Sequence, residues 1–248
     1  MLAAELVDRG DIGSADVVVE IGGGTGRLSE PLARRARHLI VIERDPALAE
    51  LLRERFARTR NVEVACGNAL DVPLPRDSFR VFGNLPFSFG TRILRRLLDD
   101  PAAGMQRLDA LVQFEVARKR AQLVPGTLTS IGWLPWWEFV LVRRVHRDAF
   151  DPVPSVDAGV LRVTRRTDPL LPTAVRPAFV AFVAHAFTSP GIPVAVSCRG
   201  RLARPVWSAL SSERGLPLTA RPAELDVTDW VALFSRTRPR AATRRAPR

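Results

Sequence analysis

The chain has 248 residues, of which 46% are hydrophobic and 25% are charged, as is usual for a globular protein with a full core. Its formal net charge of +11, from 37 basic and 26 acidic residues, indicates a polyanionic partner such as nucleic acid, with a merely soluble basic protein as the alternative. No apolar run is long enough to span a membrane, no secretory signal opens the sequence, and two cysteines and three scattered histidines lack the spacing of a disulfide framework or a metal site. We therefore expect a cytoplasmic monomer with one large domain, or one domain and a small appendage, and with no membrane or metal partner.

After a short helix at residues 2–7, the first strand signal is the β-branched run at residues 17–21, which leads into a glycine-rich turn at residues 22–26. A helical pattern follows at residues 27–37. A strand, a tight turn and a helix are the opening unit of a doubly wound α/β fold, and glycines in the turn let a nucleotide approach the backbone closely. A plain tight connection without a ligand is the alternative.

Two acidic residues make this turn more specific. Glu20 precedes the first glycine, and the alternation that begins with Gly22 and Gly24 is G-x-G-x-G, not the G-x-G-x-x-G of dinucleotide enzymes. Glu43 ends the second strand signal roughly 20 residues after Gly22, where a carboxylate can accept both ribose hydroxyls. Without a pyrophosphate-binding device further on, the pattern suits S-adenosylmethionine, whose amino-acid end carries charge but no phosphate. We therefore expect Glu20, Gly22, Gly24 and Glu43 to bind this cofactor.

A helix at residues 46–58 separates the second strand from a third, at residues 61–65, which leads into Asn68 and Ala69. Because strands of a doubly wound sheet point their carboxyl ends at the ligand, we expect both residues beside the adenine of the cofactor. There the Asn68 side chain can hydrogen-bond the exocyclic amine. A turn asparagine that bonds its own backbone is an equally good reading.

The fourth strand signal, at residues 78–83, runs into Asn84-Leu85-Pro86-Phe87, which we predict to be catalytic, with Asn84 also among the cofactor-binding residues. Adenine N6 is a poor nucleophile because its lone pair is delocalised into the ring. The Asn84 amide oxygen and a neighbouring backbone carbonyl can both accept from this NH2 and draw it toward a tetrahedral state, while Pro86 fixes φ and offers no competing N–H. Phe87 can stack on the base. Catalysis would then rest on positioning, without a general base. The alternative is an ordinary strand exit.

Basic helices follow the fourth strand. An amphipathic helix is predicted at residues 92–98, a fifth strand at 108–114, and a basic helix at 115–122. Within that last helix, Arg118 and Arg120 are predicted to hold RNA phosphates.

Two more strands, at residues 136–142 and 156–163, are predicted to form an antiparallel pair at the sheet edge. The loop between them is stiffened by prolines and displays Phe150. We expect Trp136 and Trp137 to pack in the core and not on bases.

The composition shifts near residue 166, and helical periodicity resumes beyond it. The predicted domains are therefore residues 1–166, which bind S-adenosylmethionine, and residues 167–235, a helical RNA-binding domain. Residues 236–248 are rich in arginine and almost without apolar residues, so we expect a disordered tail.

Together these motifs resemble the rRNA adenine N6-methyltransferases of the Erm and KsgA type over nearly the whole chain. The resemblance rests on Glu20-Ile21-Gly22-x-Gly24-x-Gly26-x-Leu28-Ser29, Val41-Ile42-Glu43-Arg44-Asp45, Gly83-Asn84-Leu85-Pro86-Phe87, Gln113-Phe114-Glu115-Val116-Ala117 and Phe150-x-Pro152-x-Pro154-x-Val156-Asp157. It implies an α/β fold with a Rossmann-like class I methyltransferase sheet and a small C-terminal helical domain, with S-adenosylmethionine as the cofactor.

The run Trp136-Trp137-Glu138-Phe139, together with Phe87 and the basic tail, is more similar to the actinobacterial Erm branch. That likeness implies methylation of one adenine of 23S rRNA at the peptidyl-transferase centre, resistance to macrolide, lincosamide and streptogramin B antibiotics, and Phe150 as the second aromatic around the flipped base. The alternatives are a KsgA-type enzyme acting on 16S rRNA, and a catalytically weak RNA-binding or ribosome-assembly protein on the same scaffold.

Two features differ from the family pattern. The printed sequence begins after the position of the Gln-Asn-Phe-Leu segment that usually closes over the methionine end of the cofactor. Asn68 also stands where the family usually has aspartate. An amide oxygen still accepts from the adenine amine but without the charge-assisted part of the bond, so we expect weaker cofactor binding.

Overall fold

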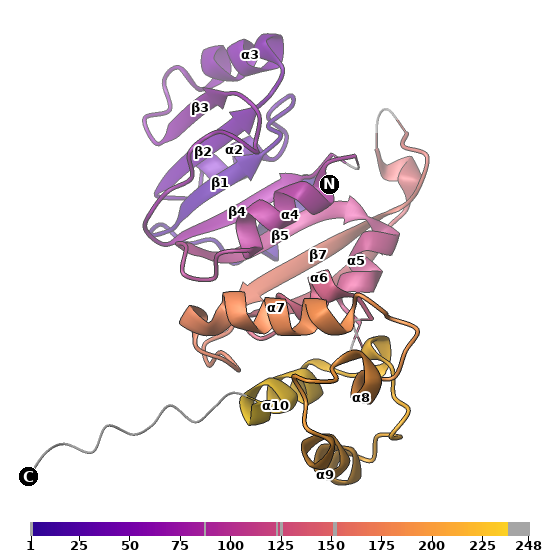
Figure 1. Ribbon diagram of the computed structural model, residues 1–248. Coiled ribbons are helices and arrows are strands. Elements are labelled where there is room, and N and C mark those ends of the chain that lie inside the picture. Colours follow the sequence, from indigo (N-terminus) through magenta and orange to yellow (C-terminus); the bar gives the residue numbers. More distant parts are fainter. Residues whose placement is uncertain (1, 87, 123, 125, 151–152, 238–248) are drawn as a thin grey trace, which may run out of the picture. The chain divides into compact units, whose positions relative to one another are not determined.

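The computed structural model forms two compact units (Figure 1). It describes residues 2–86, 88–122, 124, 126–150 and 153–237. Unit 1 comprises residues up to Ala121 together with Trp137–Thr167, and unit 2 comprises Gln122–Trp136 and the described residues from Asp168 onward. Residues 122–136, predicted to lie in the cofactor-binding domain, therefore group with the helical unit.

Unit 1 is built on a seven-stranded sheet in the order β3-β2-β1-β4-β5-β7-β6. The strands are β1 (Val17–Ile21), β2 (His38–Glu43), β3 (Val62–Cys66), β4 (Phe79–Asn84), β5 (Met105–Gln113), β6 (Trp137–Val145) and β7 (Ala158–Arg165). The first five are mutually parallel, β7 pairs antiparallel with β5, and β6 pairs antiparallel with β7 at the edge. The predicted doubly wound sheet and its antiparallel pair at the edge are confirmed.

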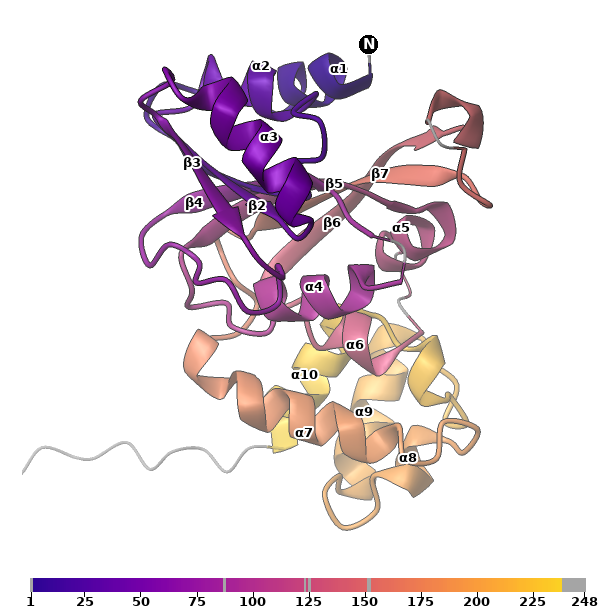
Figure 2. The ribbon, with the colours of Figure 1, turned by 90° about the horizontal axis from the view of Figure 1, so that it is seen from above.

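Helices cover both faces of this sheet (Figure 2). On one face lie α1 (Leu2–Asp8), α2 (Ser29–Ala33) and α3 (Pro46–Phe56), and on the other lie α4 (Gly90–Leu98) and α5 (Phe114–Arg120). The parallel strands β1, β2, β4 and β5 are largely buried on both sides, which is why β1 reads as an apolar run broken only by one acid. β3, at the edge of the sheet, is partly exposed.

The core of unit 1 lies between the sheet and the first three helices. Val18, Val41 and Phe82 face it from neighbouring strands and are fully buried, as are Leu32 of α2 and Leu52 of α3. Burying a side chain of this size contributes about 1.5–3 kcal/mol, so this cluster holds the helices against the strands whose ends form the site.

The two tryptophans at the start of β6 confirm the prediction that they pack in the core. Both are buried, and each indole N–H has a backbone acceptor. Trp137 Nε1 donates to the Leu98 carbonyl at 3.1 Å, and Trp136 Nε1, within unit 2, donates to the Leu171 carbonyl at 2.8 Å. Satisfied in this way, the indoles can be buried without leaving a polar group unpaired.

Unit 2 is helical. Its helices are α6 (Leu128–Ile131), α7 (Arg176–Ala186), α8 (Val194–Ser197), α9 (Arg204–Arg214) and α10 (Val227–Thr237). Phe179 and Phe182 of α7 meet Phe234 of α10 with ring centroids 5.4 and 5.8 Å apart. Offset and edge-on aromatic contacts of this kind stabilise a small core beyond the area they bury. The assignment of this unit as RNA-binding stays a prediction.

Short 3-10 turns complete the chain: η1 (Arg147–Ala149) in unit 1, and η2 (Thr173–Val175) and η3 (Pro222–Glu224) in unit 2. Most predicted elements differ from the observed ones by one to three residues at an end. Two differences are informative. The helix after the glycine turn was predicted at residues 27–37, but α2 spans only Ser29–Ala33. Gly26 has φ +83°, which no helical residue adopts, so the turn ends at or after this residue. The tail was predicted from residue 236, but α10 extends through Arg236, which pairs with Glu213 at 2.5 Å. The remaining tail residues lie outside the described part of the chain.

Cys66 and Cys198 are free thiols, as predicted. Among the described residues, none of the helices has the length and apolar character needed to cross a membrane. In the same part of the chain, no cluster of histidine, cysteine and acidic residues could hold a metal ion.

Candidate functional site

A cavity of about 300 Å³ lies at the carboxyl ends of the parallel strands of unit 1. It is bounded by the turn after β1, the end of β2, the loop after β3 and the segment after β4. The residues that line it are Ile21, Gly22, Ile42, Glu43, Arg44, Gly67, Asn68, Ala69, Pro86, Phe89 and Ile93. The crevice outside the strand ends is where doubly wound sheets bind ligands, so the topology alone places a site here.

The glycine turn brings backbone close to this cavity. Gly22 has φ +82°, and its N–H donates to the Ile42 carbonyl at 2.9 Å, which ties the turn to β2. A Cβ at this position would lie 3.5 Å from the Asn84 carbonyl oxygen, so the turn also abuts the end of β4. Because an L side chain is strained at this φ, glycine is what lets the chain turn here.

Glu43 is held in a fixed orientation at the end of β2. One carboxylate oxygen accepts from Gly24 N–H at 2.8 Å, and the other accepts from Asp45 N–H at 2.9 Å. Each oxygen has a second lone pair, so the carboxylate can still accept from two hydroxyls. Its placement fits the predicted contact with a ribose, which remains a prediction.

Asn68 lines the same cavity but also forms a local turn. Its side-chain oxygen accepts from Leu70 N–H at 3.0 Å, which is the backbone-turn alternative foreseen for it. The amide oxygen can accept one further hydrogen bond, and the NH2 group can donate. The two readings are therefore compatible, and Ala69 stands beside it in the cavity wall.

Arg96 of α4 holds this loop from behind, a role that the sequence did not reveal. Its guanidinium donates to the carbonyls of Ala69 and Val72, both at 2.5 Å. Burial lowers the pKa of Arg96, and nearby Asp71 opposes that shift. In the sequence, Arg96 is one of several arginines on a basic helix, so periodicity cannot distinguish it from a solvated one.

We expect Arg96→Met to weaken S-adenosylmethionine binding by at least roughly tenfold, about 1.4 kcal/mol. The loop that carries Asn68 and Ala69 loses two charge-assisted bonds of about 1.5–3 kcal/mol each, and the part of that loss that the cofactor must offset by ordering the loop appears as weaker binding. Isothermal titration measures the dissociation constant. Arg95→Met is the control, since Arg95 is on the same helix but exposed. Equal affinities for Arg96→Met and Arg95→Met would contradict a positioning role.

The predicted catalytic segment follows β4 directly. Asn84 is its last residue and is exposed, whereas Leu85 is buried and its N–H donates to the Leu111 carbonyl at 2.9 Å. The Pro86 carbonyl already accepts from the N–H groups of Phe89 and Gly90 at 3.0 and 2.8 Å. Both lone pairs of Pro86 are thus engaged, which leaves the Leu85 carbonyl as the better candidate for a second acceptor. Phe87 lies outside the described residues.

Glu20 was predicted to bind the cofactor, but it does not line the cavity. It is fully buried behind the glycine turn, and neither of its oxygens has a hydrogen-bond partner. Burial raises its pKa from 4.5 to about 8; the nearby Ser29 hydroxyl opposes the rise, and the Glu43 carboxylate adds to it. Any part it plays in cofactor binding acts from behind the turn.

The three remaining residues of the predicted site, Phe150, Arg118 and Arg120, differ in their burial and in their neighbours. Phe150 is half-buried and packs against the core cluster that contains Val145 and Val160, so its ring has apolar neighbours in this conformation. Arg118 is exposed on α5 and pairs with Glu115 at 2.6 Å. Arg120 is buried, which makes it a poorer candidate for a phosphate contact than the sequence suggested.

Phe89 is a cavity residue that the sequence did not single out. It precedes α4, lines the cavity, and has the guanidinium carbons of Arg44 and Arg92 at 6.0 and 5.7 Å from its ring centroid. Its position two residues after Phe87 was the available signal. Arg44 follows Glu43 directly and also lines the cavity.

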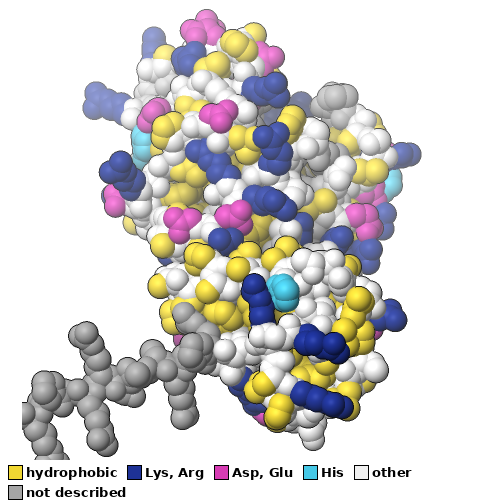
Figure 3. Space-filling view, in the orientation of Figure 1, with side chains coloured by type: hydrophobic (Ala, Val, Ile, Leu, Met, Phe, Trp, Pro, Cys, Tyr) yellow, Lys and Arg dark blue, Asp and Glu magenta, His cyan; other side chains and the backbone are white. Residues whose placement is uncertain are grey.

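The basic charge of the chain does not by itself locate a binding face. On the face shown in Figure 3, the lysine and arginine side chains are spread across both units, with acidic side chains among them. A phosphate backbone could be bound at many such positions. Net charge alone therefore does not identify the surface that binds a polyanion.

Known proteins that resemble this chain agree with the geometry of the site. A family model described as ribosomal RNA adenine dimethylase matches residues 1–236. The mycinamicin-resistance protein MyrB of Micromonospora griseorubida is 38% identical over 237 residues, which is 94% of this chain and 74% of MyrB. The ribosomal RNA small subunit methyltransferase A of Synechococcus sp. (strain JA-3-3Ab) is 32% identical over 223 residues, 87% of this chain and 79% of that protein.

Among solved structures, the 23S rRNA methyltransferase ErmE matches with a TM-score of 0.85 and 29% identity, over 95% of this chain and 96% of that one. This match confirms the predicted class I methyltransferase fold, in which the seven-stranded sheet carries the site at its strand ends.

Proposed function

Because the chain belongs to the ribosomal RNA adenine dimethylase family, and so is an rRNA adenine methyltransferase that uses S-adenosylmethionine, we propose that its substrate is one adenine of 23S rRNA at the peptidyl-transferase centre. Methylation of N6 at this adenine would give resistance to macrolide, lincosamide and streptogramin B antibiotics. The observation that carries the enzymatic reading is the arrangement of Gly22, Glu43 and Asn84 at neighbouring strand ends of one sheet.

The choice of 23S rRNA is supported by two relatives. MyrB is named for resistance to mycinamicin, and ErmE is named as a 23S rRNA methyltransferase. The likeness of the chain to a small subunit methyltransferase keeps 16S rRNA as the rival substrate. The two substrates are separated by experiment below.

The residues around the cavity fit S-adenosylmethionine. Gly22 leaves room for close approach of a nucleoside, Glu43 offers oxygens to the ribose hydroxyls, and Asn68 and Ala69 offer polar groups to the adenine edge. The volume of about 300 Å³ is at the lower end of the range for small-molecule sites. When bound, the cofactor supplies an electrophilic methyl group on a sulfonium.

The chain's own contribution to the reaction is to hold the target amine. Asn84 Oδ1 and the Leu85 carbonyl accept from the two N–H groups of adenine N6, so that its lone pair is freed from the ring and directed at the methyl group. The exposed position of Asn84 at the end of β4 suits a base that has been flipped out of its helix. Phe87 and Phe150 are proposed to stack on that base.

The proposal is tested by incubating the protein with labelled S-adenosylmethionine and either protein-free 23S or protein-free 16S rRNA. We expect label on a single adenine of 23S rRNA, located by a primer-extension stop, and none on 16S rRNA. Label on 16S rRNA alone would assign the small-subunit reaction, and absence of label with intact cofactor binding would favour a non-catalytic RNA-binding protein. Expression in a sensitive host should raise the inhibitory concentration of a macrolide.

We expect Arg118→Gln to reduce the salt dependence of RNA binding, because removing one phosphate contact lowers the slope of log K against log salt by roughly 0.7–0.9. The rate at saturating RNA should change little. The slope is measured by filter binding across a salt series. Arg53→Gln is a matched control, since Arg53 forms a similar exposed pair with Glu50 on α3. A slope for Arg118→Gln equal to that of Arg53→Gln would remove Arg118 from the RNA interface.

A further inference from the structure

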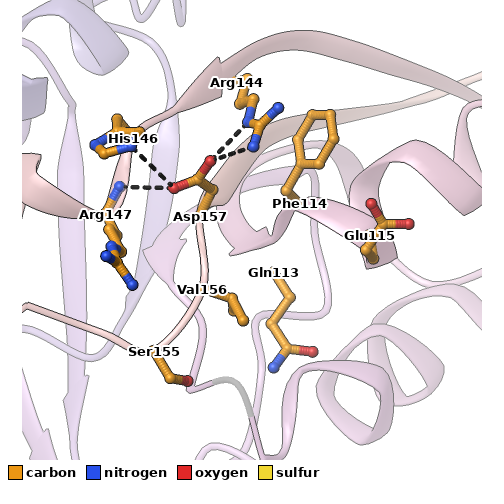
Figure 4. A pocket seen from close by; sticks show the side chains of 9 residues that line it. All are labelled: Gln113, Phe114, Glu115, Arg144, His146, Arg147, Ser155, Val156 and Asp157. Carbon is orange, nitrogen blue, oxygen red and sulfur yellow. Dashed lines mark hydrogen bonds and ion pairs between the residues drawn. The ribbon is translucent and has the colours of Figure 1, made fainter.

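A second cavity of unit 1 has no part in the site described above. It has a volume of about 440 Å³ and lies where β5 ends, where β6 ends and where the chain enters β7. Its lining residues are Gln113, Phe114, Glu115, Arg144, His146, Arg147, Ser155, Val156 and Asp157 (Figure 4). Of the described residues predicted to be catalytic or cofactor-binding, none lines it.

The wall of this cavity contains a guanidinium that is fixed from two sides. Arg144 lies between the ring of Phe114 and the carboxylate of Asp157 (Figure 4). Its Cζ is 4.6 Å from the Phe114 ring centroid, and its Nε and Nη2 lie 2.7 and 2.5 Å from Asp157 Oδ2. An arginine held by both an aromatic face and a carboxylate is preorganised, because little side-chain freedom is left to lose on binding.

Asp157 is itself anchored and nearly buried. Its Oδ1 accepts from Arg147 N–H at 3.0 Å, and its side chain is 10% exposed, whereas that of Arg144 is 62% exposed. The Arg147 N–H and the Arg144 guanidinium hold the pKa of Asp157 below its ordinary value, so the pair persists at neutral pH. The guanidinium therefore presents an open surface on a rigid support.

The groups around this surface suit a flat, neutral ring with hydrogen-bonding edges. Gln113 brings an amide that can both donate and accept, and Ser155 brings a hydroxyl that can do the same. The carboxylates of Glu115 and Asp157 are paired with Arg118 and Arg144, and the exposed Arg147 at the edge of the cavity can meet a phosphate. A nucleotide combines these features, since its base is neutral and its phosphate lies outside the ring.

The cavity lies near the proposed reaction centre along the sheet. β5 runs parallel to β4, with Leu111 opposite Asn84, and Gln113 follows two residues later. From strand spacing and rise, the backbones of Gln113 and Asn84 are on the order of 8 Å apart. A single strand that presents its adenine to Asn84 would carry a neighbouring nucleotide to this cavity.

We propose that this cavity binds the base of a nucleotide next to the target adenine, stacked on the Arg144 guanidinium and hydrogen-bonded at its edge by Gln113. The proposal rests on the proposed function for its ligand class, which is rRNA. It also gives a role to Gln113-Phe114-Glu115, a motif that the reaction itself leaves unused. Unpaired bases stacked on arginine planes are a common means of reading single-stranded RNA.

The test is a double-mutant cycle, measured on binding, that combines a substitution of Arg144 with removal of single bases of the RNA. An RNA fragment that contains the labelled adenine is made as a parent and as a series of variants. Each variant carries a single abasic nucleotide, placed at one of the two positions before or the two positions after the adenine. Binding of each RNA is measured at saturating cofactor for the wild type, Arg144→Lys and Arg143→Lys. Lysine keeps the positive charge of Arg144 but lacks the planar guanidinium group. Arg143 is the matched control, because it is the preceding residue of β6 and pairs instead with Glu5 of α1 at 3.1 Å.

We expect one abasic position to weaken wild-type binding by roughly 5- to 100-fold, the range for one stacked base. Arg144→Lys should bind the parent RNA more weakly than the wild type by a similar factor. Its affinity should not fall further when the sensitive nucleotide is made abasic, and the salt slope of binding should be unchanged. Arg143→Lys should behave as the wild type. Gln113→Ala, which leaves the Arg144 pair intact, should also be less sensitive to the same abasic position.

The proposal would be overturned if Arg144→Lys weakened binding of the parent RNA and of every abasic RNA by the same factor relative to the wild type. It would also be overturned if Arg144→Lys bound the parent RNA with the affinity of the wild type. Thermal denaturation of both lysine variants verifies that they are folded. The abasic series is centred on whichever adenine the labelling assay identifies, in 23S or 16S rRNA, and binding is read without methyl transfer. Failure of the 23S assignment therefore leaves this test intact.

Discussion

Replacing Asn84 with alanine is expected to lower kcat by roughly 10²–10³-fold, the loss seen when one preorganised hydrogen-bonding group is removed from a reaction centre. Asn84 supplies the only side-chain acceptor in the catalytic segment Asn84-Leu85-Pro86, because leucine and proline have none. Without it, one N–H of the target amine loses its partner, and the lone pair stays delocalised in the ring. Single-turnover kinetics with saturating RNA and cofactor isolates this step.

Binding should change much less than the rate. Asn84 is exposed and does not line the cofactor cavity, so the dissociation constant for S-adenosylmethionine should be close to that of the wild type. Asn84→Asp retains an acceptor oxygen at the same position and should recover part of the rate. A fully active Asn84→Ala enzyme would refute the mechanism, and an inactive one that no longer binds cofactor would point to a folding defect at the glycine turn.

The fold was predictable because its central strands are buried on both faces. β1 and β2 are short runs rich in β-branched residues. A glycine turn follows β1 at Ile21, and β2 ends in the carboxylate of Glu43. Such runs leave little choice of element or order. The start of α2 was missed by two residues because the sequence shows a glycine at Gly26 but not its positive φ.

The site was predictable only where a residue acts through its place at a strand end. Glu43 and Asn84 end β2 and β4, so topology puts them near the ligand. Arg96 and Arg120 could not be read in this way, since one holds a loop and the other is buried, although both appear in the sequence as arginines on basic helices. Burial of a long basic side chain depends on tertiary contacts that no periodicity encodes.

The pairing of Arg144 with Phe114 shows the same limit at longer range. The two residues are far apart in sequence and meet because Phe114 follows the end of β5, Arg144 lies near the end of β6, and β7 pairs with both strands. Gln113-Phe114-Glu115 was noticed as a motif, but its cavity follows from sheet order and not from spacing. The sequence thus indicates which strand ends carry functional residues, but the residues that contact them across the sheet are known only from the structure.

The largest expected effect on stability belongs to Glu20. Its pKa is raised to about 8 from 4.5, so the folded state keeps a proton that the unfolded state releases between these values. Below pH 4.5 both states are protonated, and the residue adds no pH dependence. As the pH rises toward 8, the free energy of unfolding falls by about 1.4 kcal/mol per pH unit, and the total loss is at most roughly 5 kcal/mol.

Glu20→Gln removes the titration while keeping the shape of the side chain, so its stability relative to the wild type should rise steadily from pH 4.5 to 8 and then level off. Urea unfolding without cofactor across this range measures the difference. Glu54→Gln on the exposed face of α3 removes a hydrated carboxylate instead and should give a small, nearly constant difference. A flat difference for Glu20→Gln as well would show that Glu20 titrates alike in both states.

The same experiment tests whether Glu20 senses the cofactor from behind the glycine turn. S-adenosylmethionine carries positive charge on its sulfonium and ammonium groups, and a nearby cation favours the ionised form of a carboxylate. If the charge is close enough, saturating cofactor lowers the pKa of Glu20, and the pH-dependent part of the difference between wild type and Glu20→Gln shrinks. The slope against pH is the readout, because a merely weaker affinity of the variant would shift the difference without changing that slope. A slope unaffected by cofactor would make Glu20 a structural residue alone.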